Sequence, residues 1–185
     1  MRLLQHILLV VACLVFAGFV AGYLRLFRRP EGTPAEMQAM AVLSGLAAAL
    51  QIAALASRRV DWPSFVAALA LYLAAAALYL WTAWTTRRRR LSIAFSADRP
   101  EFLLRDGPYR MIRHPFYTSY MLYWTAGLVA TWRPWLAPAV ALMGGCYLWA
   151  ARREERKFAQ SPLAAAYRAY QAATGMFVPK LLGRR

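Results

Sequence analysis

Acidic, histidine and cysteine side chains are scarce in this 185-residue sequence, which contains 8 Asp or Glu, 2 His and 2 Cys. Cys13 and Cys146 both lie in apolar stretches, so we predict neither a disulfide framework nor a metal site and interpret both as packing residues. Charged residues make up 17% of the chain and hydrophobic residues 61%. A soluble domain has about 25% charged residues. The composition therefore excludes an ordinary soluble domain and a disordered chain.

Positive charge is abundant: 23 Lys or Arg give a net charge of +15. The arginines stand in short clusters between long apolar blocks. That placement is typical of the cytoplasmic anchors of a membrane protein. We therefore predict contact with membrane lipids and no nucleic-acid partner.

The apolar blocks predict an all-α, multi-pass transmembrane protein, a single membrane domain over 1–185. A spanning helix needs about 20 apolar residues. Residues 3–24 exceed the apolar region of a signal peptide and are followed directly by arginines, so we interpret them as a retained span. About five spans are predicted, at residues 3–24, 37–57, 62–86, 116–131 and 135–151.

Arginine placement also predicts the orientation. Most arginines fall in the loops after the first and third spans and in the tail after residue 151. Because cytoplasmic loops carry the excess of arginine, we expect the N-terminus outside and the C-terminus in the cytoplasm, in a bacterial inner membrane. The tail from Arg152 is expected to be a cytoplasmic helical segment that continues to about Ala173, because Gly175 and Pro179 then stop it.

The segment DGPYRMIRHPFY, Asp106 to Tyr117, is the first candidate for chemistry. Pro115 favours a helix start, which places His114 just before the N-terminus of the fourth span at the membrane surface. The free N–H groups of such a start attract anions. The alternative is a basic interfacial anchor in which His114 only caps the helix.

The second candidate is ARREERKF, Ala151 to Phe158, where the fifth span leaves the membrane. Adjacent glutamates on a helix diverge by about 100°, so only one of Glu154 and Glu155 is expected to face inward. The alternative is a solvated turn in which both pair with neighbouring basic residues. A hairpin of the last two spans returns the pair to the membrane face that holds His114. Together the two segments provide opposite charges for a zwitterionic amino-acid group.

These segments carry a resemblance to a known group of enzymes. GPYRMIRHPFY, then EERKF and YRAYQAATGMFVP, resemble the isoprenylcysteine carboxyl methyltransferase and phospholipid methyltransferase group of integral membrane enzymes. The likeness covers about residues 101–179. It implies an S-adenosylmethionine pocket at the cytoplasmic face. The cofactor contacts that it implies are Phe102, Leu103, Leu104, Tyr109, His114, Pro115, Phe116, Tyr117 and Glu154.

The chain departs from the family pattern in the spacing between the glutamate pair and Tyr167, which is about one residue longer, and at two single positions. Ser119 stands where the family often has glycine, and Ala150 stands near the place of the substrate-side arginine of the prenylcysteine enzymes. Arg152 and Arg153 are the nearest replacements and, with Arg110, the candidate substrate-binding residues. The sequence does not single out a catalytic residue, and the candidates for that role are Arg113, Tyr117 and Glu155.

The expected reaction is methyl transfer from S-adenosylmethionine to a lipophilic small molecule or lipid. A carboxylate acceptor needs no base, whereas a hydroxyl or amine acceptor needs one. Two other functions stay open at this point. One is a membrane reductase that uses NADPH, since sterol reductases look similar at their C-terminal end. The other is a non-enzymatic membrane scaffold.

Overall fold

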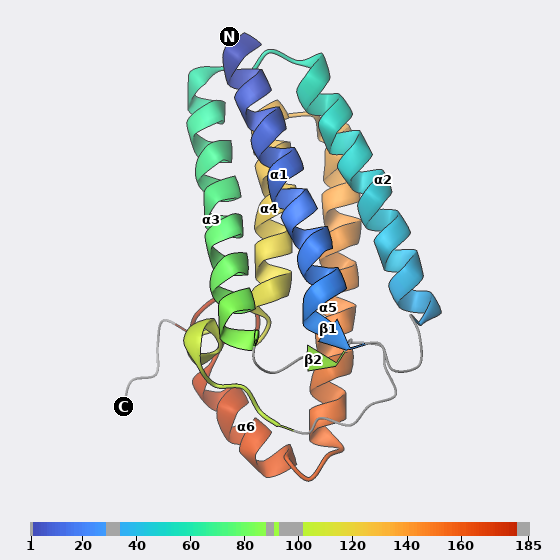
Figure 1. Ribbon diagram of the computed structural model, residues 1–185, viewed down its shortest axis with the longest axis vertical. Helices are drawn as coiled ribbons and strands as arrows, with labels where there is room; N and C mark the ends of the chain where they lie inside the picture. The colour runs from blue at the N-terminus through green and yellow to red at the C-terminus, as the bar shows by residue number, and fades with distance from the viewer. Residues whose placement is uncertain (1, 29–33, 88–90, 93–101, 181–185) are drawn as a thin grey trace.

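The computed structural model describes residues 2–28, 34–87, 91–92 and 102–180. Glu101 and the predicted anchors Arg29, Arg88–Arg90 and Arg99 lie outside these residues. Five helices run alternately up and down a bundle, and a sixth lies beyond its lower end (Figure 1). The helices are α1 (Arg2–Leu26), α2 (Ala35–Ser57), α3 (Trp62–Thr86), α4 (Pro115–Thr131), α5 (Ala137–Ala159) and α6 (Ala164–Ala173).

Short elements connect the helices. At the lower end, strand β1 (Phe27–Arg28) pairs in parallel with strand β2 (Leu91–Ser92), which joins the chain after α1 to the chain after α3. The 3₁₀ turns η1 (Gly107–Arg110) and η2 (Pro134–Leu136) precede α4 and α5. The all-α prediction is thus confirmed, since the only strands in the described part of the chain are these two-residue segments.

Within the described ranges, four helical segments are long and apolar enough to cross a membrane: Arg2–Leu26, Ala35–Ser57, Trp62–Thr86 and Pro134–Ala159. This is consistent with a membrane protein. The remaining predicted span corresponds to α4, which has 17 residues. At 1.5 Å per residue it is about 25 Å long, a little less than a hydrocarbon core of about 30 Å.

Local signals explain where several helices begin and end. Asp61 caps α3 by accepting a hydrogen bond from the Ser64 backbone N–H at 2.9 Å. Pro115 starts α4, where its missing N–H costs nothing. Trp132, with a φ of 49°, ends α4 in the left-handed conformation.

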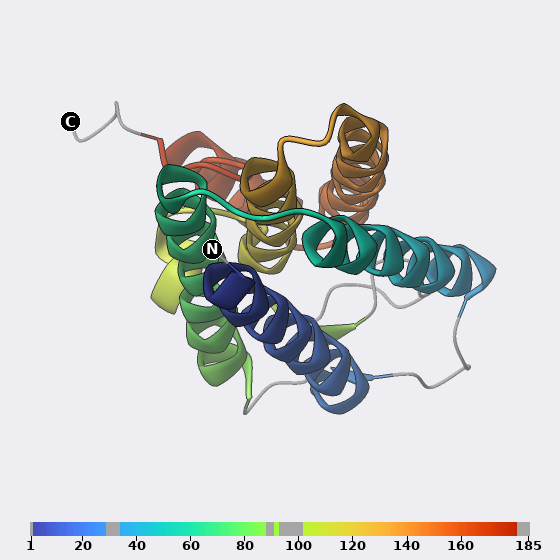
Figure 2. The same ribbon diagram turned by 90° about the horizontal axis from the view of Figure 1, so that it is seen from above.

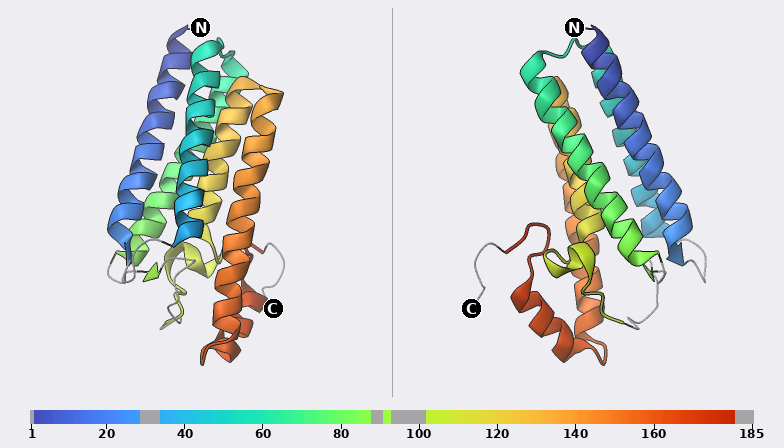
Figure 3. Two further views of the ribbon diagram at one scale, coloured as in Figure 1. Left: turned by 90° about the vertical axis from the view of Figure 1, so that its right-hand side faces the viewer. Right: turned by 60° about the vertical axis from the view of Figure 1, so that its left-hand side comes forward.

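The predicted tail helix is interrupted in the structure. Helix α5 continues past the predicted end of the last span to Ala159, so its charged end projects beyond the bundle (Figure 3). The tail then turns through residues 160–163 before α6 begins. Pro162 lacks an N–H for a continuous helix, and Ser161 Oγ accepts from the Leu163 N–H instead.

The core combines small residues with buried aromatic rings. Seen from above, α4 lies between α3 and α5 (Figure 2). Tyr72 and Tyr123 are fully buried, with ring centroids 5.4 Å apart. Helix α1 has glycines at 18 and 22, and Gly22 has the close contact: a Cβ there would lie 1.7 Å from Tyr79 Oη. A Cβ on Gly18 would meet nothing within 4 Å.

Candidate functional site

The segment before α4 and the segment after α6 are joined backbone to backbone at the lower end of the bundle. Gly107 has a φ of 56°, which lets the chain turn into η1. Ile112 forms a parallel bridge with Gly175, and the Arg113 N–H donates to the Gly175 carbonyl at 2.9 Å. The His114 N–H donates to the Met176 carbonyl at 3.1 Å. These bonds fix the backbone on which the two candidate side chains, Arg113 and His114, are mounted.

The His114 ring lies between the two glutamates of α5. Its Nδ1 is 3.4 Å from Glu154 Oε2, and its Nε2 is 3.2 Å from Glu155 Oε1. Only 5% of the His114 side chain is exposed, and it makes no capping bond to α4. The ring therefore links α4 to α5 and does not act as a helix cap. The predicted return of the glutamates to His114 is confirmed.

Glu154 and Glu155 have different further partners. Glu154 Oε1 accepts a hydrogen bond from the Tyr117 hydroxyl and is 31% exposed. Glu155 accepts from Arg113 Nε at 2.7 Å and from Gln171 Nε2 at 2.9 Å, and is 13% exposed. Neither carboxylate is part of a solvated charged turn of α5.

Arg113 connects three elements. Besides the ion pair with Glu155, its Nη1 donates to the carbonyls of Gln171 and Thr174 at the end of α6. The side chain is 10% exposed. Because a helix C-terminus leaves carbonyl groups unpaired, a guanidinium there holds α6 against the bundle.

The charges of this cluster favour a protonated His114. Burial alone would lower the pKa of its imidazole. The hydrogen bonds to Glu154 and Glu155, with the attraction of both carboxylates, outweigh burial and raise the pKa above its ordinary 6.5. The imidazolium then donates from both ring nitrogens. Nearby, burial and the charge of Glu154 raise the pKa of Tyr109 well above 10, so its hydroxyl stays neutral.

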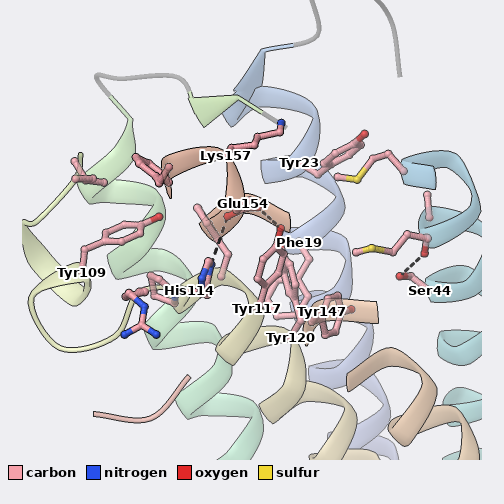
Figure 4. Close-up of a pocket in the computed structure, with 18 of the residues that line it drawn as sticks. Phe19, Tyr23, Ser44, Tyr109, His114, Tyr117, Tyr120, Tyr147, Glu154 and Lys157 are labelled. Atoms are coloured by element: carbon pink, nitrogen blue, oxygen red, sulfur yellow. Dashed lines mark hydrogen bonds and ion pairs between the residues drawn. The ribbon is translucent and has the colours of Figure 1, made fainter. Parts of the chain in front are cut away.

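A cavity of about 460 Å³ adjoins the cluster. Known small-molecule sites range from about 300 to 1,000 Å³. The polar side chains of His114, Glu154 and Lys157 line one end of the cavity (Figure 4), and Arg113 is a further charged lining residue. The other end lies between the membrane helices and is lined by side chains such as Phe16, Phe19, Val20, Leu24, Met37, Met40 and Ala41. We call the part of the cavity lined by the charged side chains the charged chamber, and the part lined by α1 and α2 the apolar chamber.

Most of the predicted site residues line this cavity. All nine residues implied as cofactor contacts do so: Phe102, Leu103, Leu104, Tyr109, His114, Pro115, Phe116, Tyr117 and Glu154. Arg113, a catalytic candidate, also lines it. Glu155 lies behind His114 and is not among the lining residues.

The predicted substrate-binding arginines lie elsewhere. Arg110 and Arg152 are exposed, and neither lines the cavity. Arg153 forms a 3.5 Å ion pair with Glu36 of α2 and lies 6.0 Å from the centroid of the Trp149 ring. The described geometry therefore gives none of the three a place beside a molecule in the cavity.

The sequence did not predict that residues of α1 and α2 line part of the cavity. Phe19, Met37 and Met40 differ in no visible way from lipid-facing residues, since both kinds are apolar. Lys157 is one turn from Glu154 and could have been found from that spacing. The other missed lining residues include Tyr23, Ser44, Tyr147, Tyr167 and Tyr170.

Comparison with known proteins gives no assignment: no protein-family model matches the chain, and neither a curated protein nor a solved structure matches it. The functional argument therefore starts from the geometry of the cavity and of the two charged segments.

Proposed function

We propose that the protein transfers a methyl group from S-adenosylmethionine to a lipophilic acceptor at the cytoplasmic face of a membrane. The observation that carries the proposal is that one cavity contains both a charged chamber and an apolar chamber. A polar methyl donor fits the first and a membrane-derived acceptor fits the second. The charged chamber lies at the bundle end that holds Arg25, Arg87, Arg105 and Arg152, and this supports its placement in the cytoplasm.

The residues of the charged chamber fit an amino-acid group. The partly exposed carboxylate of Glu154 faces the cavity and suits an α-ammonium group. Lys157 lines the same chamber and supplies positive charge for an α-carboxylate. Phe102, Leu103 and Tyr109 provide apolar and aromatic surface suited to an adenine ring.

Aromatic rings mark the junction of the two chambers. The rings of Tyr117 and Tyr147 stack with centroids 5.6 Å apart, and Tyr120 and Tyr147 are 5.5 Å apart. Such rings attract a cationic sulfonium group. When bound, S-adenosylmethionine supplies an electrophilic methyl group. The protein's residues would hold donor and acceptor in line and exclude water from the apolar chamber.

Equilibrium binding of labelled S-adenosylmethionine to the detergent-purified full chain tests this proposal. We expect saturable binding of S-adenosylmethionine. In a parallel measurement we expect labelled NADPH not to bind. Charge-assisted hydrogen bonds contribute about 1.5–3 kcal/mol, so Glu154→Gln should raise the dissociation constant about ten- to a hundredfold.

Glu36→Gln is the matched control for this measurement. Glu36 lies at the same end of the bundle, is 42% exposed and is not a lining residue. Its substitution should leave the affinity unchanged. Absence of S-adenosylmethionine binding, or binding of NADPH in its place, would overturn the methyltransferase proposal.

A further inference from the structure

The Tyr117 hydroxyl stands between the cavity and a carboxylate. Tyr117 lines the cavity, and its hydroxyl donates to Glu154 Oε1 (Figure 4). Its ring is held on both sides: it stacks on His114 with centroids 5.7 Å apart and on Tyr147 at 5.6 Å. A hydroxyl fixed in this way can accept a proton on one side as it gives its own proton to the carboxylate on the other.

From this geometry we infer that the Tyr117–Glu154 pair is the general base of the reaction and that the methyl acceptor is a neutral lipid hydroxyl group. This inference rests on the proposed methyltransferase function. It adds the substrate class and the route of the proton.

The step balances in atoms and charge. The acceptor O–H bond breaks as its oxygen forms a bond to the methyl carbon, and the carbon–sulfur bond breaks with its electron pair left on sulfur. The acceptor proton passes to Tyr117 Oη while the Tyr117 proton passes to Glu154 Oε1. The sulfonium loses one positive charge and Glu154 loses one negative charge, so the net charge around the cavity does not change.

The charges around the pair suit this role. Glu154 faces His114 and Tyr117 from the α4 segment, Tyr109 from η1, Tyr167 from α6 and Lys157 on α5. The nearby ion pair between Arg113 and Glu155 adds no net charge to the surroundings of the Tyr117–Glu154 pair. The His114 ring holds one oxygen of Glu154, with Nδ1 3.4 Å from Oε2, while the other oxygen, Oε1, accepts from Tyr117.

The apolar chamber favours a neutral acceptor. Its described lining from α1 and α2 contributes no charged side chain, so nothing there balances an acceptor carboxylate. A carboxylate would also bring no proton for the Tyr117–Glu154 pair to accept. An ammonium acceptor would repel the sulfonium beside it.

The experiment uses the full chain in lipid nanodiscs, methyl-tritiated S-adenosylmethionine and a lipid extract of the membranes that contain the protein. We expect label in a neutral, alkali-stable methyl ether. An alkali-labile product that releases tritiated methanol is a methyl ester and would overturn the inference. A labelled amine, which partitions into acid, would overturn it as well.

Tyr117→Phe tests the base itself. General-base catalysis contributes about 10²- to 10⁴-fold, so turnover should fall by about that factor. Saturable binding of S-adenosylmethionine should be retained, because phenylalanine keeps the ring that attracts the sulfonium. The residual rate should rise about tenfold per pH unit, because the acceptor must then ionise unaided. If Tyr117 had only a structural role, its substitution would not make the rate rise with pH in this way.

Tyr72→Phe is the matched control, because Tyr72 is fully buried outside the cavity and bonds only to Gln51 among the described contacts. It should keep the wild-type pH profile. Wild-type turnover in Tyr117→Phe would overturn the inference and leave the methyltransferase proposal standing. If the wild-type protein does not bind S-adenosylmethionine, the methyltransferase proposal itself is overturned.

Discussion

His114 is the residue on which the charged cluster depends, because its two ring nitrogens reach two different carboxylates. A neutral imidazole has one N–H and can donate to only one of them. The start of α4 is therefore bonded to both carboxylates of α5 when the ring is protonated, and to only one of them when it is neutral.

The raised pKa of His114 makes the stability of the fold depend on pH. A group whose pKa is higher in the folded protein stabilises the fold fully below its unfolded value and loses that contribution as the pH rises through the folded value. The melting temperature of the detergent-solubilised protein should therefore fall as the pH rises from 6.5 through this raised pKa.

His114→Asn should remove the His114 component of this pH dependence. His6, at the other end of the bundle in α1, provides the control, since His6→Asn should keep the wild-type slope. A His114→Asn protein that melts with the same pH dependence as the wild type would show that another group controls it.

At the scale of elements, α2 and α4 meet where a glycine faces a buried amide. Gln51 of α2 is 2% exposed and donates to the Tyr72 hydroxyl at 3.0 Å. A Cβ at Gly127 of α4 would lie 2.2 Å from Gln51 Cδ. Glycine is therefore what allows this polar contact inside the apolar bundle.

Gly127→Ala should destabilise the protein by about 1–3 kcal/mol, because the added methyl group overpacks a filled site. Gly145→Ala on α5 is the matched control: its Cβ would meet nothing within 4 Å, and alanine is the better helix former. Chemical unfolding in detergent measures both. Equal stability of the two variants would show that Gln51 moves aside without cost.

The sequence predicted the elements better than their contacts. The run Ala35–Ser57 is apolar enough to predict a helix, but hydropathy does not separate Met40, which lines the cavity, from Leu46, which is exposed. Both sides of a membrane helix are apolar, so the buried side carries little signal.

The charged segments were more informative, because few charges approach the membrane. The juxtaposition of His114 with Glu154 follows from a hairpin of two apolar blocks, and the structure has it. The partner of Glu155 could not be predicted from the sequence in the same way. Arg113 reaches it because residues 174–177 hold the backbone of the 111–114 segment, and that pairing has no sequence pattern of its own.

At the scale of the whole molecule, the N-terminal end of α1 and the C-terminal end of α6 lie at opposite ends of the bundle (Figure 1). With the arginine-rich end in the cytoplasm, a reporter fused after Arg185 should be cytoplasmic and one fused at the N-terminus should be outside. Paired alkaline phosphatase and fluorescent-protein fusions measure this. Detection of both ends on one side would contradict the five-span topology.

The bridge between Ile112 and Gly175 has a consequence for how the protein is made. Residues 164–177 leave the ribosome after all five long helices, yet Tyr167 and Tyr170 line the cavity and the following residues fix His114. During synthesis the bundle therefore enters the bilayer with its charged chamber still unfinished. The nascent chain gains its complete chamber only when this late segment folds back from the aqueous side.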